Sequence, residues 1–255
     1  MTFHRRIALV SAGLLSTAGL TAGLAAPSSA APKPPTSEPT AATAERGDAA
    51  LDAIKRDGAQ AIAVRQAQLT KLAGRLAAAP TCDADGTIAG VIAADGPALT
   101  ALGTKLASDT TVAEARADRA SIFEDFRVFA VVTPQASVTS ACGHIETAAA
   151  SLAENQTKLA ARVDEAAAGG ADMTAARTAL ADMTAQLAEA TAQANDANAS
   201  LAAIGPDHGD AAVAATNRAA VDHARAELQD AHGDLEAALA DARAVVAELK
   251  AAAAG

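Results

Sequence analysis

The chain has 255 residues, 51% hydrophobic but only 2% aromatic, and its 30 acidic and 20 basic side chains give a formal net charge of −10. An acidic surface repels phosphate backbones, so no nucleic acid partner is expected, and attraction to anionic lipid is disfavoured. The abundant alanine cannot fill a thick core, but it favours helix formation and lets helices approach closely. We therefore predict an all-α fold, an elongated antiparallel helical bundle with a coiled-coil hairpin.

Residues 1–30 have the organisation of a secretory signal peptide. Arg5 and Arg6 provide a basic start, residues 7–26 carry no charge, and Ser28, Ser29 and Ala30 place small residues before a cleavage site. Glycines and hydroxyls interrupt the apolar stretch, so we expect cleavage near Ala30 and no transmembrane anchor in the mature chain. The predicted location is secreted or in the cell envelope, and the paired arginines leave general and twin-arginine export both open.

Residues 31–47 and 48–168 differ in composition, and we predict a leader followed by a helical bundle. The first segment mixes four prolines with Thr, Ser and Ala, which is typical of a disordered leader. A one-sided apolar stripe then predicts a helix over 48–79. Helical spacing continues over 88–106, where Gly96-Pro97 should break or kink the helix.

The next predicted helix starts at a capping box. Thr111 and Glu114 have the required spacing, and the helix should run through the phenylalanines until Pro134 closes it. A long helix then follows from about Ser137 and ends at Gly169-Gly170.

Residues 171–252 predict an antiparallel coiled-coil hairpin. From Met173 to Ile204, apolar residues alternate steps of three and four without a miss, which is a heptad seam. The turn at 205–209 is short, so the helices on either side must run antiparallel, and Asp210 can cap the second one.

The second helix of the hairpin shows a less regular seam. Leu239 and Val246 are expected to join it in its second half, whereas Arg225 and His232 should weaken its first half. The main seam recurs every seven residues at Val221, Leu228, Leu235, Ala242 and Leu249.

Cys82 and Cys142 are the only cysteines in the chain. An even pair in an exported protein predicts a disulfide, here joining the end of the first helix to the helix after Pro134. Two unpaired thiols, or a bond between two chains, are the alternatives.

Four groups of residues contain side chains that can bind metal ions. Asp83 and Asp85 open a segment that resembles an EF-hand loop, but Ile92 stands where the bidentate Glu belongs, so a helix-capping turn is favoured. Asp207, His208 and Asp210 are ordinary turn residues as well as possible ligands. His223 and His232 are nine residues apart and fall on opposite faces of a helix, and His144 lies near Cys142. No metal site is predicted.

The sequence contains no catalytic motif that we recognise. It has no Gly-x-Ser-x-Gly, no His-Glu-x-x-His and no phosphate-binding glycine loop. We therefore predict no enzyme activity, no catalytic residue and no cofactor.

Residues 122–132 form an aromatic knot, the one concentrated apolar block. Phe123, Phe126 and Phe129 recur at helical spacing, with Arg127 among them. We interpret the knot as a core contact between the shorter helices, with Arg127 paired to a carboxylate. The alternative is an exposed patch that binds a partner.

The same block carries a resemblance. Asp109-Thr110-Thr111-Val112, Asp125-Phe126-Arg127-Val128-Phe129 and Val132-Thr133-Pro134-Gln135 resemble a segment of uncharacterised exported helical proteins of high-GC bacteria. The resemblance is limited to residues 109–135. It implies export and an all-helical fold, and it carries no functional residue, because that family has no assigned activity.

Together these features predict a non-enzymatic helical protein of the cell envelope that acts as a structural spacer or protein-binding platform. Its partner would be an unknown protein, or a second copy through helix association. Binding of lipid or another hydrophobic ligand by amphipathic helices is the alternative function, followed by metal binding.

Overall fold

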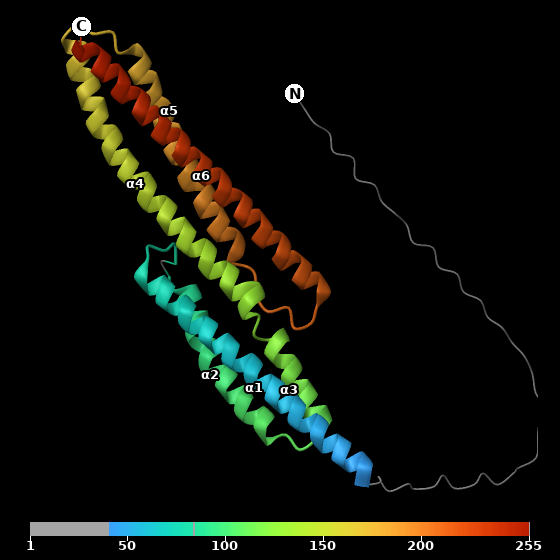
Figure 1. Ribbon diagram of the computed structural model, residues 1–255. Coiled ribbons are helices and arrows are strands. Elements are labelled where there is room, and N and C mark those ends of the chain that lie inside the picture. Colours follow the sequence, from blue (N-terminus) through green and yellow to red (C-terminus); the bar gives the residue numbers. More distant parts are fainter. Residues whose placement is uncertain (1–40, 84, 255) are drawn as a thin grey trace, which may run out of the picture. The chain divides into compact units, whose positions relative to one another are not determined.

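The computed structural model describes residues 41–83 and 85–254, with side chains from residue 45, and every regular element in this part of the chain is a helix (Figure 1). This confirms the predicted all-α fold. The signal peptide and residues 31–40 of the predicted leader lie outside the described residues. The helices are α1 (Ala41–Ala78), α2 (Thr87–Ser108), α3 (Val112–Glu124), the π-helix η1 (Val128–Val132), α4 (Thr133–Ala168), α5 (Thr174–Leu201) and α6 (Ala211–Ala254).

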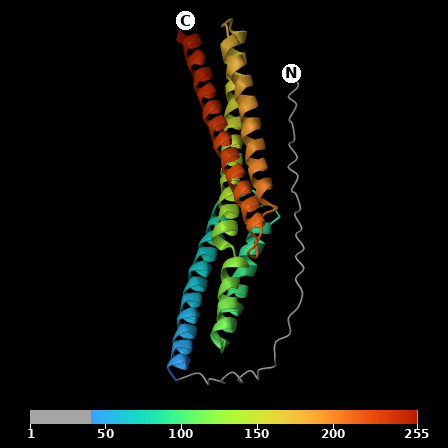
Figure 2. The same ribbon diagram turned by 90° about the vertical axis from the view of Figure 1, so that its right-hand side faces the viewer.

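The helices pack in two groups. In the first, α1 lies against α2 and α3 around a core of large aliphatic residues, among them Leu72, Leu99 and Ile122, which are fully buried. In the second, α4, α5 and α6 pack side by side (Figures 1 and 2). Here α5 runs antiparallel to the other two helices, and α4 and α6 run parallel to each other.

The seam of α5 agrees with its prediction. All ten apolar residues from Met173 to Ile204 are buried, and five of them are alanine or methionine with no exposed surface. Small side chains allow α4 and α6 to approach α5 closely, so an alanine-rich seam can be fully enclosed without bulky residues.

The seam of α6 differs from its prediction in one position of the heptad. The seven-residue repeat from Val221 to Leu249 is buried or half-buried as expected. Its partner positions are Ala224, Ala231, Ala238 and Val245, all with no exposed surface. The predicted partners were wrong: Arg225 and His232 are exposed, and Leu239 and Val246 are 39% and 37% exposed.

Two helix boundaries also differ. α1 begins at Ala41 rather than at 48, so residues 41–47 of the predicted leader are helical. α2 continues through Gly96-Pro97, so the predicted break is wrong. The Thr100 hydroxyl donates to the Gly96 carbonyl at 3.1 Å, and Gln66 of α1 donates to the same hydroxyl at 2.8 Å. The contact from Gln66 holds α2 against α1 next to Pro97, which has no N–H to donate.

The phenylalanine segment is not one helix. The Thr111–Glu114 capping box is formed as predicted, but α3 ends at Glu124. Arg127 leaves the helical conformation with ψ 45°, and the chain resumes as η1 and then α4. Pro134 therefore lies in the first turn of α4 rather than closing a helix, a position where its missing N–H costs nothing.

None of the described helices is long and apolar enough to cross a membrane.

Candidate functional site

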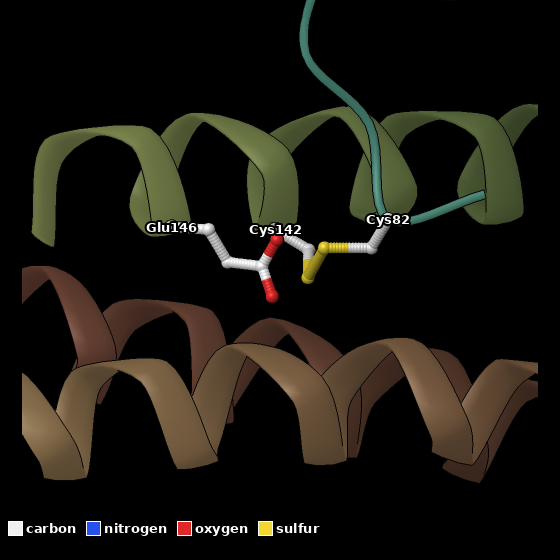
Figure 3. Close-up of side chains that lie close together, drawn as sticks. All are labelled: Cys82, Cys142 and Glu146. Atoms are coloured by element: carbon white, nitrogen blue, oxygen red, sulfur yellow. A yellow bond between two sulfur atoms is a disulfide. The ribbon is translucent and has the colours of Figure 1, made fainter. Parts of the chain in front are cut away.

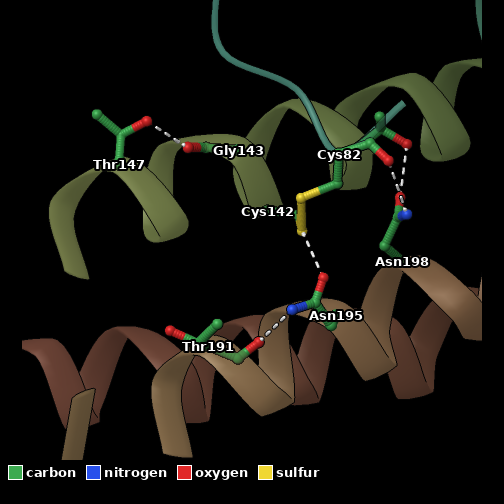
Figure 4. The surroundings of a disulfide bond; sticks show 8 residues. Cys82, Cys142, Gly143, Thr147, Thr191, Asn195 and Asn198 are labelled. Carbon is green, nitrogen blue, oxygen red and sulfur yellow. Dashed lines mark hydrogen bonds between the residues drawn. A yellow bond between two sulfur atoms is a disulfide. The ribbon is translucent and has the colours of Figure 1, made fainter. Parts of the chain in front are cut away.

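The Cys82–Cys142 disulfide links the segment after α1 to the N-terminal third of α4, with the two Cα atoms 5.8 Å apart (Figure 4). The predicted internal bond is thus confirmed. The Cys82 N–H donates to the Thr139 carbonyl at 3.1 Å, and Asn198 of α5 donates to the Cys82 carbonyl at 3.3 Å. The bond therefore joins both groups of helices at a point where the backbone is also held by hydrogen bonds.

Gly143 explains how the segment before Cys82 can lie so close to α4. A Cβ atom at this position would stand 2.4 Å from the carbonyl carbon of Pro80 and from the nitrogen of Thr81. Only glycine leaves room for this backbone-to-backbone contact.

The Glu146 carboxylate lies beside the disulfide (Figure 3). This carboxylate and the two sulfur atoms lie within 4.8 Å of one another, the one group of metal-ligand spacing in the described part of the chain. Both thiols are consumed by the disulfide, so a single carboxylate remains as a ligand. On the other side, the Asn195 carbonyl oxygen lies 3.9 Å from the Cys142 sulfur, a packing contact because a disulfide sulfur has no proton to donate.

Asp83 and Asp85 act as helix caps. The two carboxylate oxygens of Asp83 accept from the N–H groups of Ile88 and Ala89, each at 3.0 Å. Asp85 accepts from the Thr87 N–H at 3.2 Å, and its hydrogen bonds to Thr87 lower its pKa. The capping interpretation of this turn is confirmed.

The turn between α5 and α6 is used in contacts with the end of α3. Asp207, only 4% exposed, forms an ion pair with Arg127, the carboxylate partner predicted for this arginine. His208 lies 2.7 Å from Asp125, and the hydrogen bond from this histidine lowers the pKa of Asp125. Asp210 accepts from the Ala212 N–H at 2.7 Å and caps α6 as predicted. Each of the three turn residues thus has its own structural partner.

Burial raises the pKa of Asp207, but the hydrogen bonds from the Arg127 guanidinium and the Gly209 N–H outweigh it, so the net shift is downward. The carboxylate is thereby held in its charged form.

The aromatic knot is split between the core and the surface. Phe126 packs against the core of α1–α3, whereas Phe123 and Phe129 are 36% and 48% exposed. The Arg65 guanidinium lies 4.4 Å from the centre of the Phe123 ring and 5.7 Å from that of Phe129. Burial, and then the charge of Arg127, lower the pKa of Arg65. The two exposed rings therefore enclose a cation from α1.

Two apolar grooves lie between neighbouring helices. The α1–α2 groove encloses about 680 Å³ over Leu69, Leu76 and Ile92, with Gln66 and Thr100 among its polar lining residues. The second, which we call the α4–α6 groove, encloses about 710 Å³. It is lined by Leu152, Asn155, Lys158, Leu159, Arg162, Leu239, Ala242, Arg243, Val246, Ala247 and Lys250.

The α4–α6 groove was not predicted from the sequence. Its apolar residues repeat every seven positions on both helices, at Leu152 and Leu159 of α4 and at Leu239 and Val246 of α6. The repeat on α6 was visible in the sequence, but it was assigned to the buried seam. Only the register between α4 and α6 shows that these residues line one groove.

Comparisons with protein-family models, with curated proteins and with solved structures found no match to this chain. The resemblance at residues 109–135 therefore stays a hypothesis, and the site is interpreted from its own geometry.

Proposed function

We propose that this chain is an exported, non-enzymatic helical protein that serves as a protein-binding platform or structural spacer in the cell envelope. The observation that carries the proposal is the packing of α4, α5 and α6. The seam that these helices share is buried, including its alanines. Large apolar side chains nevertheless remain exposed on the neighbouring face of α6, at Leu239 and Val246. A long, rigid helical surface with an apolar stripe is what a binding platform presents to a partner.

Two further observations support the proposal. A disulfide between the only cysteines is typical of proteins that mature outside the cytosol. Three carboxylates of the predicted turns have structural partners, since Asp83 and Asp210 cap helices and Asp207 pairs with Arg127. Carboxylates used in this way have structural rather than chemical roles.

Export and partner capture can be tested in the same cells. A C-terminally tagged full-length chain, produced in its native bacterium, should be found outside the cytosol, cleaved near Ala30 and resistant to thiol alkylation until reduced. Cross-linking of intact cells should then attach it to an envelope protein. An uncleaved cytosolic chain with two free thiols would overturn the proposal.

The α1–α2 groove favours a second candidate function, binding of a hydrophobic ligand. Its apolar volume of about 680 Å³ is within the range of small-molecule sites. Binding would appear as displacement of a fluorescent fatty acid or as co-sedimentation with neutral liposomes, and should be lost in Ile92→Asp. The absence of both signals would dismiss this candidate.

A further inference from the structure

The α4–α6 groove has a regular apolar pattern. Leu152 and Leu159 of α4 and Leu239 and Val246 of α6 line it, so each of the two parallel helices (Figure 1) contributes two large apolar residues one heptad apart. Ala242 forms the base between them and is 9% exposed. Large side chains one heptad apart on both helices are the pattern that receives the side chains of another helix.

Leu239 and Val246 pack against none of the buried clusters, whereas Leu152 and Leu159 are half-buried and pack against the core of α4, α5 and α6. The buried clusters include Ala224, Ala231, Ala238 and Val245 of α6, which have no exposed surface. Leu239 and Val246 follow two of these positions by one residue, so they face about 100° away from the seam. Some 38% of each of these side chains is left in solvent.

Basic side chains surround the groove. Lys158 and Arg162 of α4 and Arg243 and Lys250 of α6 all line it, and its lining includes no acid. None of the four forms an ion pair within the described residues. Acids occur beside the groove on both helices: Glu154 precedes Lys158 by four residues, Glu165 follows Arg162 by three, and Glu236, 3.3 Å from His232, precedes Leu239 by three. In a chain with 30 acidic and 20 basic side chains, this grouping is a local reversal of charge.

We propose that the α4–α6 groove binds an acidic amphipathic helix of a partner protein. The inference rests on the proposed platform function and specifies its partner. Leucine-like side chains of the partner would enter between the large apolar residues of the two helices, and its flanking Asp or Glu residues would pair with the four cations. From Leu239 to Lys250 the groove extends about 16 Å at 1.5 Å per residue, so the partner helix needs about three turns.

A second copy of this chain is a poor occupant. In a twofold-symmetric dimer through this groove, the four cations would face the same four cations, which is repulsive. Elsewhere in the described residues, the large exposed apolar side chains are Val64, Val91, Phe123, Phe129 and Val213. They include no pair spaced one heptad apart on a helix, so a second copy offers no matching ridge in another orientation.

A lipid surface fits less well than a helix. The apolar residues lie in a concavity between two helices, which a helix can enter and a flat headgroup layer cannot. The remaining surface is acidic and is repelled by anionic lipid.

The test uses the full-length, oxidised protein and two fluorescent helical peptides of 18 residues that share one leucine heptad seam. One peptide has Glu on both flanks of the seam and the other has Lys. We expect the Glu-flanked peptide to bind, by anisotropy, at least ~10-fold more tightly than the Lys-flanked one, and binding to weaken with salt. Equal binding of the two peptides, or no binding of either, would overturn the inference.

Two double variants, each reversing two positive charges, test whether the peptide binds in the α4–α6 groove. R243E/K250E should weaken binding of the Glu-flanked peptide by about 10-fold, which corresponds to two charge pairs of ordinary strength. K71E/R75E changes the net charge by the same amount on exposed positions of α1 and should leave binding within twofold. Equal effects of the two double variants would show that the peptide is held by non-specific electrostatic attraction, and would refute the groove as its binding site.

Two controls distinguish a partner helix from the other possible occupants of the groove, a second copy of the chain and a lipid surface. Light scattering should show a monomer, and vesicles of phosphatidylglycerol and phosphatidylcholine should not compete with the peptide. A dimer lost in Leu239→Glu, or vesicle binding lost in R243E/K250E, would assign the groove to self-association or to lipid instead. If the Glu-flanked peptide does not bind while cross-linking in cells still captures an envelope protein, the proposed groove partner is wrong and the platform function is retained.

Discussion

Removal of the disulfide should lower the free energy of unfolding by about 4 kcal/mol. Cys82 and Cys142 are 60 residues apart, and the loss of loop-closure entropy for a loop of this length gives about 14 cal/mol/K, or about 4 kcal/mol at 25 °C. Typical domains are stable by 5–15 kcal/mol, so the variant should remain folded but become much easier to denature.

The measurement is urea unfolding followed by circular dichroism at 222 nm, comparing the native chain with Cys82→Ala/Cys142→Ala. Reduction of the native chain should give the same destabilisation, and the reductant should not affect the double variant. A loss below about 1 kcal/mol would refute the reasoning, because it would mean that the bond does not restrict the unfolded chain.

Three further predictions concern packing and charge. Gly143→Ala should destabilise by about 2 kcal/mol, because the new methyl group would collide with the backbone at Pro80 rather than with a movable side chain; an unchanged melting temperature would contradict this close approach. Leu72→Ala, at a fully buried position of α1, should lower the free energy of unfolding in urea by about 3 kcal/mol. Val64→Ala, at an exposed position of the same helix, should lower it by less than about 1 kcal/mol. Because the folded-state pKa of Asp207 is lowered, its stabilisation is complete above the unfolded pKa of about 4 and is lost as pH falls through the lower folded value. Melting temperatures measured between pH 7 and pH 2 should therefore fall on the acid side, and less steeply in Asp207→Asn; identical slopes would show that this carboxylate is not linked to stability.

Local sequence patterns correctly predicted helix caps and the α5 seam. The capping box at Thr111, the caps at Asp83 and Asp210 and the seam of α5 were all predicted from spacing and are present. Each depends on contacts within a few residues, or on a repeat in which large side chains stand out against alanine.

The wrong predictions for α6 concern positions where alanine makes the contacts between helices. In α6, Ala224, Ala231 and Ala238 occupy the buried positions, while the larger Leu239 and Val246 are exposed. A hydrophobicity pattern ranks the larger residues first, although close helix approach requires the smaller ones. The α4–α6 groove was missed for a related reason, since it depends on the register between helices more than 80 residues apart in the chain.

The end of α3 could not have been predicted from its own residues. The segment through Phe123, Phe126 and Phe129 keeps helical spacing across the point where the helix stops. The conformation there is held by distant groups, with Asp207 paired to Arg127 and His208 to Asp125. Tertiary contacts have overridden local propensity at this position.

The position of the disulfide has a mechanical consequence. When the chain is stretched from α1 and α6, tension that reaches Cys82 passes directly to Cys142, and residues 83–141 carry none of it. Stretching experiments on single molecules should therefore show about 200 Å of extra extension only after a reductant is added, since an extended residue spans about 3.4 Å. The bond therefore keeps tension away from α2 and α3, although tension passes through the other helices.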